Sequence, residues 1–103
     1  MQVIESTECG SILNKDLALI YIYTPFCGTC HLARTILETV EHTLERTVFF
    51  EMNASLHPKF MQTYKIESVP CLLITKRGEI VEKVYAFHSV SYMYEKTREY
   101  VRI

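Results

Sequence analysis

The sequence lacks the features that would place the protein in a membrane or on a nucleic acid. None of its apolar runs approaches the roughly 20 residues needed to cross a bilayer. The formal net charge is -1, and no block of like charge forms a tail, so we expect neither a membrane nor a nucleic-acid partner. Residues 1–8 are acidic and polar, unlike a signal peptide. We therefore expect a cytoplasmic protein, in a compartment that disfavours structural disulfides.

Repeats, low-complexity segments and linkers are also missing. The 103 residues suffice for one domain, 1–103, with its own hydrophobic core, and we expect it to be a monomer. Four cysteines are then interpreted as thiols, and the close pair among them requires an explanation: Cys9, Cys27, Cys30 and Cys71.

Hydrophobic patterning predicts alternating strands and helices. Residues 17–23 are apolar throughout, which is typical of a central strand buried on both faces. After Pro25, apolar residues recur at helical spacing from Cys27 to about Arg46. The other expected elements are an edge strand over 2–4, a short helix capped by Ser6 or Thr7, a strand over 47–53, a helix opened by His57-Pro58, strands over 71–75 and 80–86, and a last helix capped by Ser89. This order predicts a mixed sheet with helices on both faces.

Cys27 and Cys30 stand where the central strand passes into the long helix. Positions i and i+3 share a helix face, close enough for two sulfurs to bond. At the helix start, free N–H groups and the dipole would stabilise a Cys27 thiolate, and Cys30 could attack a mixed disulfide formed there.

Two alternatives to disulfide chemistry stay open for this pair. The first is two inert buried thiols. The second is a metal site, for which Cys71 and His31 could complete the ligands. A structural zinc site usually needs a second ligand pair, and the sequence has no second CxxC and no HxxxH.

Val69-Pro70 precedes the apolar strand at residues 71–75. Proline cannot donate to a strand ladder, so this one belongs at the start of the strand. The sequence alone leaves its isomer open.

These motifs resemble the thioredoxin family over nearly the full length of the chain. The matching stretches are the strand 18–23, Phe26-Cys27-Gly28-Thr29-Cys30, the following helix, His57-Pro58, Ser68-Val69-Pro70-Cys71 and the hairpin at 76–79. The resemblance implies an α/β thioredoxin fold, a central mixed β-sheet flanked by helices on both faces, with Pro70 cis and packed against the cysteines. It implies that Cys27 is the nucleophile and Cys30 the resolving thiol. It also implies a substrate-binding surface made by Phe26, Gly28, Thr29, Pro70 and the backbone of Val69.

The chain departs from the family pattern around the cysteines. Phe26 and Thr29 stand where the family usually has Trp and Pro, and the chain has no Trp. Tyr21 replaces a buried acid, and Glu51 best matches the lysine beside that acid. The family's proton route therefore does not carry over. Glu51 is a candidate proton acceptor for Cys30, the alternative being a solvated strand residue.

Three neighbours of the motif have a plain structural interpretation. Tyr85 stands where the family has a groove-opening glycine. Cys71 is either a third thiol near the site or, as we expect, a buried apolar residue. We expect His31 to be a surface residue, because it points away from the pair on a helix.

The pair and the resemblance together predict an enzyme of cell redox homeostasis, a thiol–disulfide oxidoreductase that reduces disulfides in partner proteins. It would need no cofactor or metal and would itself be reduced by an upstream disulfide reductase. One alternative is a thioredoxin-like binding module without turnover, which the changes at Tyr21, Glu51 and Tyr85 motivate. Another is a disulfide oxidant or isomerase, because a sequence does not give the direction of electron flow.

Overall fold

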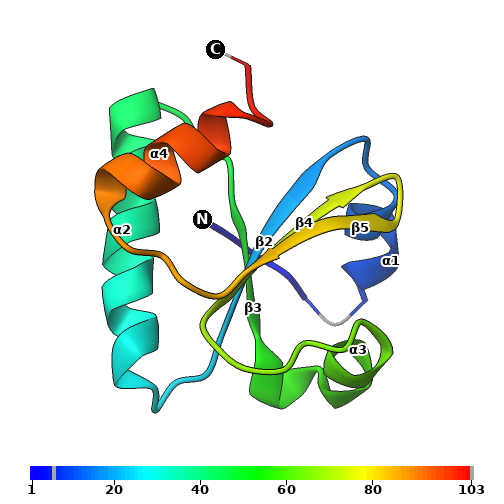
Figure 1. Ribbon diagram of the computed structural model, residues 1–103. Coiled ribbons are helices and arrows are strands. Elements are labelled where there is room, and N and C mark those ends of the chain that lie inside the picture. Colours follow the sequence, from blue (N-terminus) through cyan, green and yellow to red (C-terminus); the bar gives the residue numbers. More distant parts are fainter. Residues whose placement is uncertain (6, 103) are drawn as a thin grey trace.

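The computed structural model describes residues 1–5 and 7–102, so the predicted cap at Ser6 lies outside the described residues (Figure 1). In chain order the elements are β1 (Gln2–Val3), α1 (Cys9–Leu13), β2 (Ala18–Tyr23), α2 (Gly28–Leu44), β3 (Phe50–Asn53), the 3-10 helix η1 (Ala54–Leu56), α3 (Pro58–Thr63), β4 (Cys71–Lys76), β5 (Glu79–Val84) and α4 (Val90–Arg98).

Five strands form one mixed sheet in the order β1-β3-β2-β4-β5. The first three are parallel to one another, and β4 is antiparallel to both β2 and β5. Figure 1 shows α2 and α4 on one face of the sheet and α1 and α3 on the other. The predicted mixed sheet with helices on both faces is confirmed.

The central strand β2 is buried on both faces, as its apolar composition predicts. Leu19 and Tyr21 pack into the core under α2 and α4. Ala18, Ile20 and Ile22 point the other way, into the core under α1 and α3. Side chains alternate along a strand, so one strand serves both cores. The burial ends near Tyr23, where the chain leaves the sheet for α2.

The predicted strand over 47–53 is too long by three residues, because its first part is held by a helix side chain. A carboxylate oxygen of Glu41 accepts hydrogen bonds from the backbone N–H groups of Val48 and Phe49, at 2.9 and 3.0 Å. These N–H groups donate to α2 and not to a neighbouring strand. The ladder with β2 therefore begins at Phe50.

The starts of α3 and α4 follow the predictions, whereas the start of α1 does not. Pro58 is the first residue of α3, and the Ser89 hydroxyl accepts a hydrogen bond at the start of α4. The predicted cap at Thr7 is wrong, because Glu8 occupies that position. Its carboxylate accepts a hydrogen bond from the backbone N–H of Glu5 at 3.0 Å, outside the helix.

Candidate redox site

The cysteine pair lies at the junction of β2 and α2, as the sequence predicts. Cys27 is the N-cap of α2, with extended backbone angles. Its sulfur accepts a hydrogen bond from the backbone N–H of Cys30 at 3.2 Å. The Cys27 sulfur thus lies beside the first turn of a 17-residue helix, at the positive end of its dipole. The N–H groups of this turn have no partner within the helix. This environment favours a thiolate over a thiol when the pair is reduced.

Cys27 and Cys30 are joined by a disulfide, with their Cα atoms 5.2 Å apart. Cys27 is half-buried, whereas Cys30 is 2% exposed. An incoming sulfur can therefore reach Cys27 far more readily than Cys30. Among residues 1–5 and 7–102, no group of three or more His, Cys, Asp or Glu side chains is placed to hold a metal ion.

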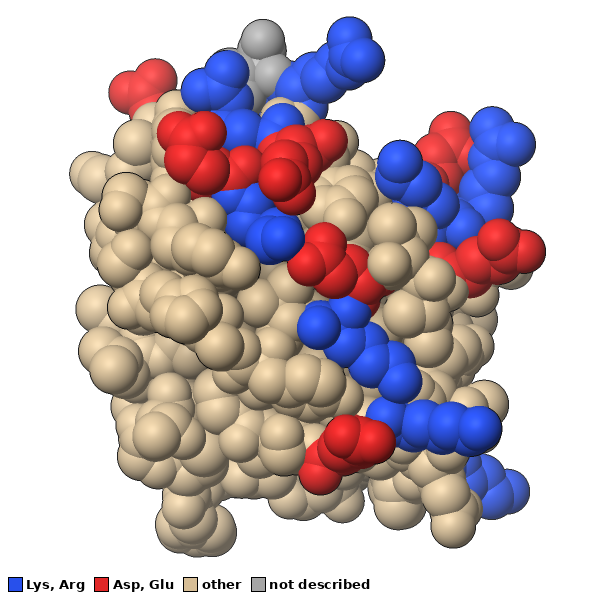
Figure 2. All heavy atoms as spheres, in the orientation of Figure 1, with Lys and Arg blue, Asp and Glu red and all other residues tan. Residues whose placement is uncertain are grey.

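The predicted substrate-binding residues of the motif itself are exposed. Phe26 is 101% exposed, and Gly28 and Thr29 are exposed as well. The Thr29 hydroxyl lies 3.4 Å from the Cys27 sulfur. On the face shown in Figure 2, the charged side chains lie toward the top and the right, and the lower left corner, where α2 begins in Figure 1, has none.

Pro70 shares a hollow with the motif, although the two are 40 residues apart. The Val69–Pro70 peptide bond is cis. Pro70 and Thr29 both line a hollow of about 290 Å³ beside the disulfide. Its other lining residues come from α2 and from the segment after β5: Leu32, Ala33, Ile36, Tyr85, Phe87 and His88. The sequence reasoning missed Leu32, Phe87 and His88, which the helical spacing after Cys30 and the end of the hairpin could have suggested.

A polar cluster lies under the second cysteine. The hydroxyl of Tyr21, which is fully buried, donates to the backbone carbonyl of Cys30. Tyr21 stacks on Tyr23 with ring centroids 5.6 Å apart. The Arg34 guanidinium lies over both rings, 5.3 and 4.7 Å from their centroids. Tyr21 therefore ties the sheet to the first turn of α2.

Glu51 holds Arg34 in place over these rings. Its two carboxylate oxygens accept hydrogen bonds from two Arg34 nitrogens, at 3.1 and 3.2 Å. The Glu51 side chain is 14% exposed and that of Arg34 is 26% exposed. Glu51 and Tyr21 are register partners in adjacent strands, which brings this pair beneath the motif. The sequence reasoning missed Arg34 as part of this site, although its spacing of four residues from Cys30 on the helix was a usable signal.

The environment keeps Tyr21 a hydrogen-bond donor. Burial raises the pKa of Tyr21 to about 12, and the positive charge of Arg34 offsets only part of this. Burial alone would lower the pKa of Arg34, but the hydrogen bonds and charge of Glu51 outweigh it and raise that pKa. At neutral pH Tyr21 is thus a phenol and cannot take the proton of Cys30.

The remaining neighbours behave as structural residues. Cys71 is fully buried at the start of β4, opposite Ile22 in β2. Burial raises the pKa of its thiol to about 12, although Lys83 and Tyr85 lower it slightly. His31 is exposed. Both expectations for these residues are confirmed.

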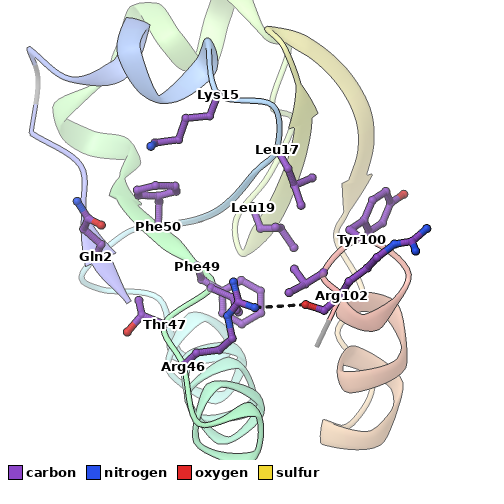
Figure 3. Close-up of a pocket in the computed structure, with 12 residues that line it drawn as sticks. Gln2, Lys15, Leu17, Leu19, Arg46, Thr47, Phe49, Phe50, Tyr100 and Arg102 are labelled. Carbon is purple, nitrogen blue, oxygen red and sulfur yellow. Dashed lines mark hydrogen bonds between the residues drawn. The ribbon is translucent and has the colours of Figure 1, made fainter.

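A second hollow lies at the other end of the sheet and has no part in this site. Its volume is about 320 Å³, and it is lined by residues from the start of β2, the start of β3 and the end of the chain. Figure 3 shows Leu17, Leu19 and Phe49 among the residues that line it. The Arg46 side chain donates a hydrogen bond to the carbonyl of Arg102 at 3.3 Å. None of the predicted site residues lines it.

In residues 1–5 and 7–102, no helix has the length and apolar character required to cross a membrane.

Comparisons with known proteins agree with this geometry. The family model named Thioredoxin matches residues 2–97. The thioredoxin-like protein YusE of Bacillus subtilis is 48% identical over 87 residues, which cover 84% of this chain and 82% of that protein. Two solved structures share the fold. A mutant thioredoxin from Halobacterium salinarum has a TM-score of 0.79 and 22% identity, covering 100% of this chain and 91% of that one. The thioredoxin of Plasmodium falciparum has a TM-score of 0.83 and 18% identity, covering 98% of this chain and 100% of that one.

Because burial raises its pKa from 9.0 to about 12, we predict that Cys71 is inert in the folded protein. At about pH 8 its thiolate fraction falls about a thousandfold relative to an unperturbed thiol. Mass spectrometry of the reduced protein treated with iodoacetamide should show Cys71 modified only after unfolding in urea. Labelling of Cys71 at the same rate with and without urea would contradict its assignment as a core residue.

Proposed function

The chain belongs to the thioredoxin family and is a thiol–disulfide oxidoreductase, and on this premise we propose that it reduces disulfide bonds in partner proteins. The asymmetry of its cysteine pair supports this most directly. The half-buried sulfur of Cys27 lies on free helix N–H groups, and the buried sulfur of Cys30 lies within bonding distance of it. One sulfur is thereby suited to attack a partner and the other to release it.

The proposed cycle balances in sulfur, electrons and protons. The Cys27 thiolate attacks one sulfur of a partner disulfide, forming a mixed disulfide and releasing the other partner sulfur as a thiolate. Cys30, after losing its proton, then attacks Cys27. The partner leaves with two thiols, and the enzyme keeps the disulfide. An upstream disulfide reductase returns the two electrons.

We propose that the substrate segment lies over the uncharged corner at the start of α2. Phe26, Gly28 and Thr29 offer exposed contacts there, and Pro70 lines the adjoining hollow. Val69 lies two residues before β4, outside the strand ladder, so its backbone would pair with an extended segment.

We further propose that residues 1–103 act as a single-domain monomer in the cytoplasm. Two hydrophobic cores on the two faces of one sheet support the single domain. A cytoplasmic setting accords with Cys9 and Cys71, which are free thiols.

The proton of Cys30 needs an acceptor during the second attack, and we propose Glu51. Tyr21 is unsuited, because its pKa of about 12 keeps it protonated. Glu51 is a half-buried carboxylate in the polar cluster below Cys30, where Arg34 holds both of its oxygens in place. A carboxylate held in this way below a buried thiol can act as a general base.

Serine variants of the pair should separate the two steps. Reduced wild-type protein should reduce the exposed disulfides of insulin, and Cys27→Ser should abolish this activity because no attacking sulfur remains. Cys30→Ser should trap partners as mixed disulfides, visible as adducts that a small thiol reverses.

The double variant Cys27→Ser/Cys30→Ser is the matched control for docking. If it captured the same partners as wild type, while folded wild type left insulin intact, the protein would be a binding module and our proposal would be wrong. Net formation of disulfides in reduced insulin chains would instead identify a disulfide oxidant.

Glu51→Gln tests the proton route. The Cys9→Ser background removes the one free thiol outside the pair that is not fully buried among the described residues. Stopped-flow reaction with a small chromogenic disulfide then resolves the second phase, in which Cys30 attacks Cys27. If Glu51 takes the proton, this phase should slow at least about tenfold near neutral pH. Its rate should then rise with pH, because only the Cys30 thiolate formed by solvent remains reactive.

Two variants distinguish proton transfer from positioning. Glu38 lies one turn from Arg34 on α2 and is exposed, so Glu38→Gln should leave the second phase unchanged. Arg34→Gln removes the ion pair but keeps the carboxylate. If Arg34→Gln and Glu51→Gln slowed the phase equally and left its pH dependence unaltered, Glu51 would act only by holding Arg34.

A further inference from the structure

Another cysteine, Cys9, lies next to a histidine on the other face of the sheet. Cys9 is the first residue of α1, and His57 immediately precedes α3. The Cys9 sulfur lies 3.7 Å from Nδ1 of His57, within hydrogen-bond reach for sulfur. Cys9 is half-buried and His57 is 9% exposed. Figure 1 shows α1 and α3 on the same side of the molecule, away from the start of α2.

The thiol and the imidazole both line a groove of about 550 Å³. Most of its walls are apolar. Leu56, which lines the groove, is 69% exposed. Phe60 and Tyr64 also line it, with their ring centroids 4.6 Å apart. Among the described residues that line the groove, Lys59 carries a full charge and none is a carboxylate. A concave apolar surface with a few polar groups is typical of a small-molecule site.

We propose that Cys9 is a site of reversible S-thiolation by small disulfides with an aromatic or similarly apolar body and an anionic group. In this site His57 is the base that takes the proton of Cys9. The apolar walls would hold the body of the disulfide, and Lys59 would contact its anionic group. The groove shares no lining residue with the hollow beside Cys27 and Cys30, so this site is additional to the proposed reductase site.

The reaction is a thiol–disulfide exchange that needs no further oxidant. The Cys9 thiol gives its proton to Nδ1 of His57, which the tautomer with its hydrogen on Nε2 leaves free to accept it. The Cys9 sulfur attacks one sulfur of the small disulfide, and a mixed disulfide forms. The other half leaves as a thiolate, so Cys9 is oxidised and half of the small molecule is reduced.

The surroundings of Cys9 make a neighbouring base necessary. Burial raises the pKa of its thiol, and the negative charge of Glu8 adds to this, although a backbone hydrogen bond acts in the opposite direction. The free thiolate is therefore scarce at neutral pH. The other charged or titratable groups that line the groove are Lys59 of α3 and Tyr64, the residue that follows α3. His57 is the group whose ring nitrogen lies close enough to the Cys9 sulfur to accept its proton.

The test uses the full chain with the redox pair removed, as Cys27→Ser/Cys30→Ser, so that its outcome does not depend on the proposed reductase activity. Cys9 and the buried Cys71 are then the remaining thiols. The probe is dithiobis-nitrobenzoate, an aromatic disulfide with carboxylates, whose released thiolate is coloured. Adding Cys9→Ser should remove the signal, and mass spectrometry should place the adduct on Cys9.

His57→Asn should slow the reaction at least about tenfold near neutral pH, because asparagine is tolerated at the N-cap of α3 but is not a base. His42 is exposed on α2, and the matched variant His42→Asn should react as the parent does. Circular dichroism checks that each variant is folded. Lys59→Gln should slow the anionic probe about two- to fivefold and leave the neutral dithiodipyridine unaffected.

Two results would overturn the proposal, and the second needs no variant of His57. The first is an unchanged Cys9 rate in folded His57→Asn, which would make the pair a packing contact. The second is a lack of selectivity, measured as the ratio of the Cys9 reaction rates with dithiobis-nitrobenzoate and with the cationic, aliphatic cystamine. We expect this ratio to be higher in the folded chain than in the same chain in urea. If the preference were the same in both states, the groove would not bind the disulfide.

Discussion

The proposed chemistry depends first on the hydrogen bond from the backbone N–H of Cys30 to the sulfur of Cys27. This hydrogen bond exists because the chain leaves the fully buried strand β2 and enters α2 within a few residues, with Cys27 as the helix cap. The sheet and the apolar face of α2, including Leu37 and Val40, fix where that helix begins. Small displacements of the strand end would carry the sulfur away from the helix N–H groups that stabilise its thiolate.

Beneath this junction lie the Arg34–Glu51 ion pair and the stacked rings of Tyr21 and Tyr23. The resemblance to the thioredoxin family had implied a buried acid at the position of Tyr21. The Tyr21 hydroxyl holds the carbonyl of Cys30, and Arg34 covers Tyr21 while bound to Glu51. The charge of Glu51 is thus compensated, and a compensated carboxylate is far less costly to bury than an isolated one. The same cluster links β2, β3 and α2, so the residues proposed to handle the proton also position the second cysteine.

Much of this arrangement could be predicted from the sequence, and the failures have a common cause. The unbroken apolar run at 17–23 and the helical spacing after it are local signals, and the structure has both elements. The early part of the strand predicted over 47–53 is missing because Glu41, seven or eight residues away on α2, captures two of its N–H groups. Arg34 was likewise missed, since its partner Glu51 lies 17 residues further on. The register between helix and sheet decides such contacts, and periodicity does not report it.

The reduction potential of the Cys27–Cys30 pair tests the central claim most directly, because it determines the direction of electron flow. Equilibration with dithiothreitol mixtures of known poise, followed by mass spectrometry, measures it on the intact chain. A reductase requires a value near that of thioredoxin, about -270 mV, or below it. A value near or above about -180 mV, where protein disulfide isomerase lies, would contradict the account, because the pair would then oxidise its partners.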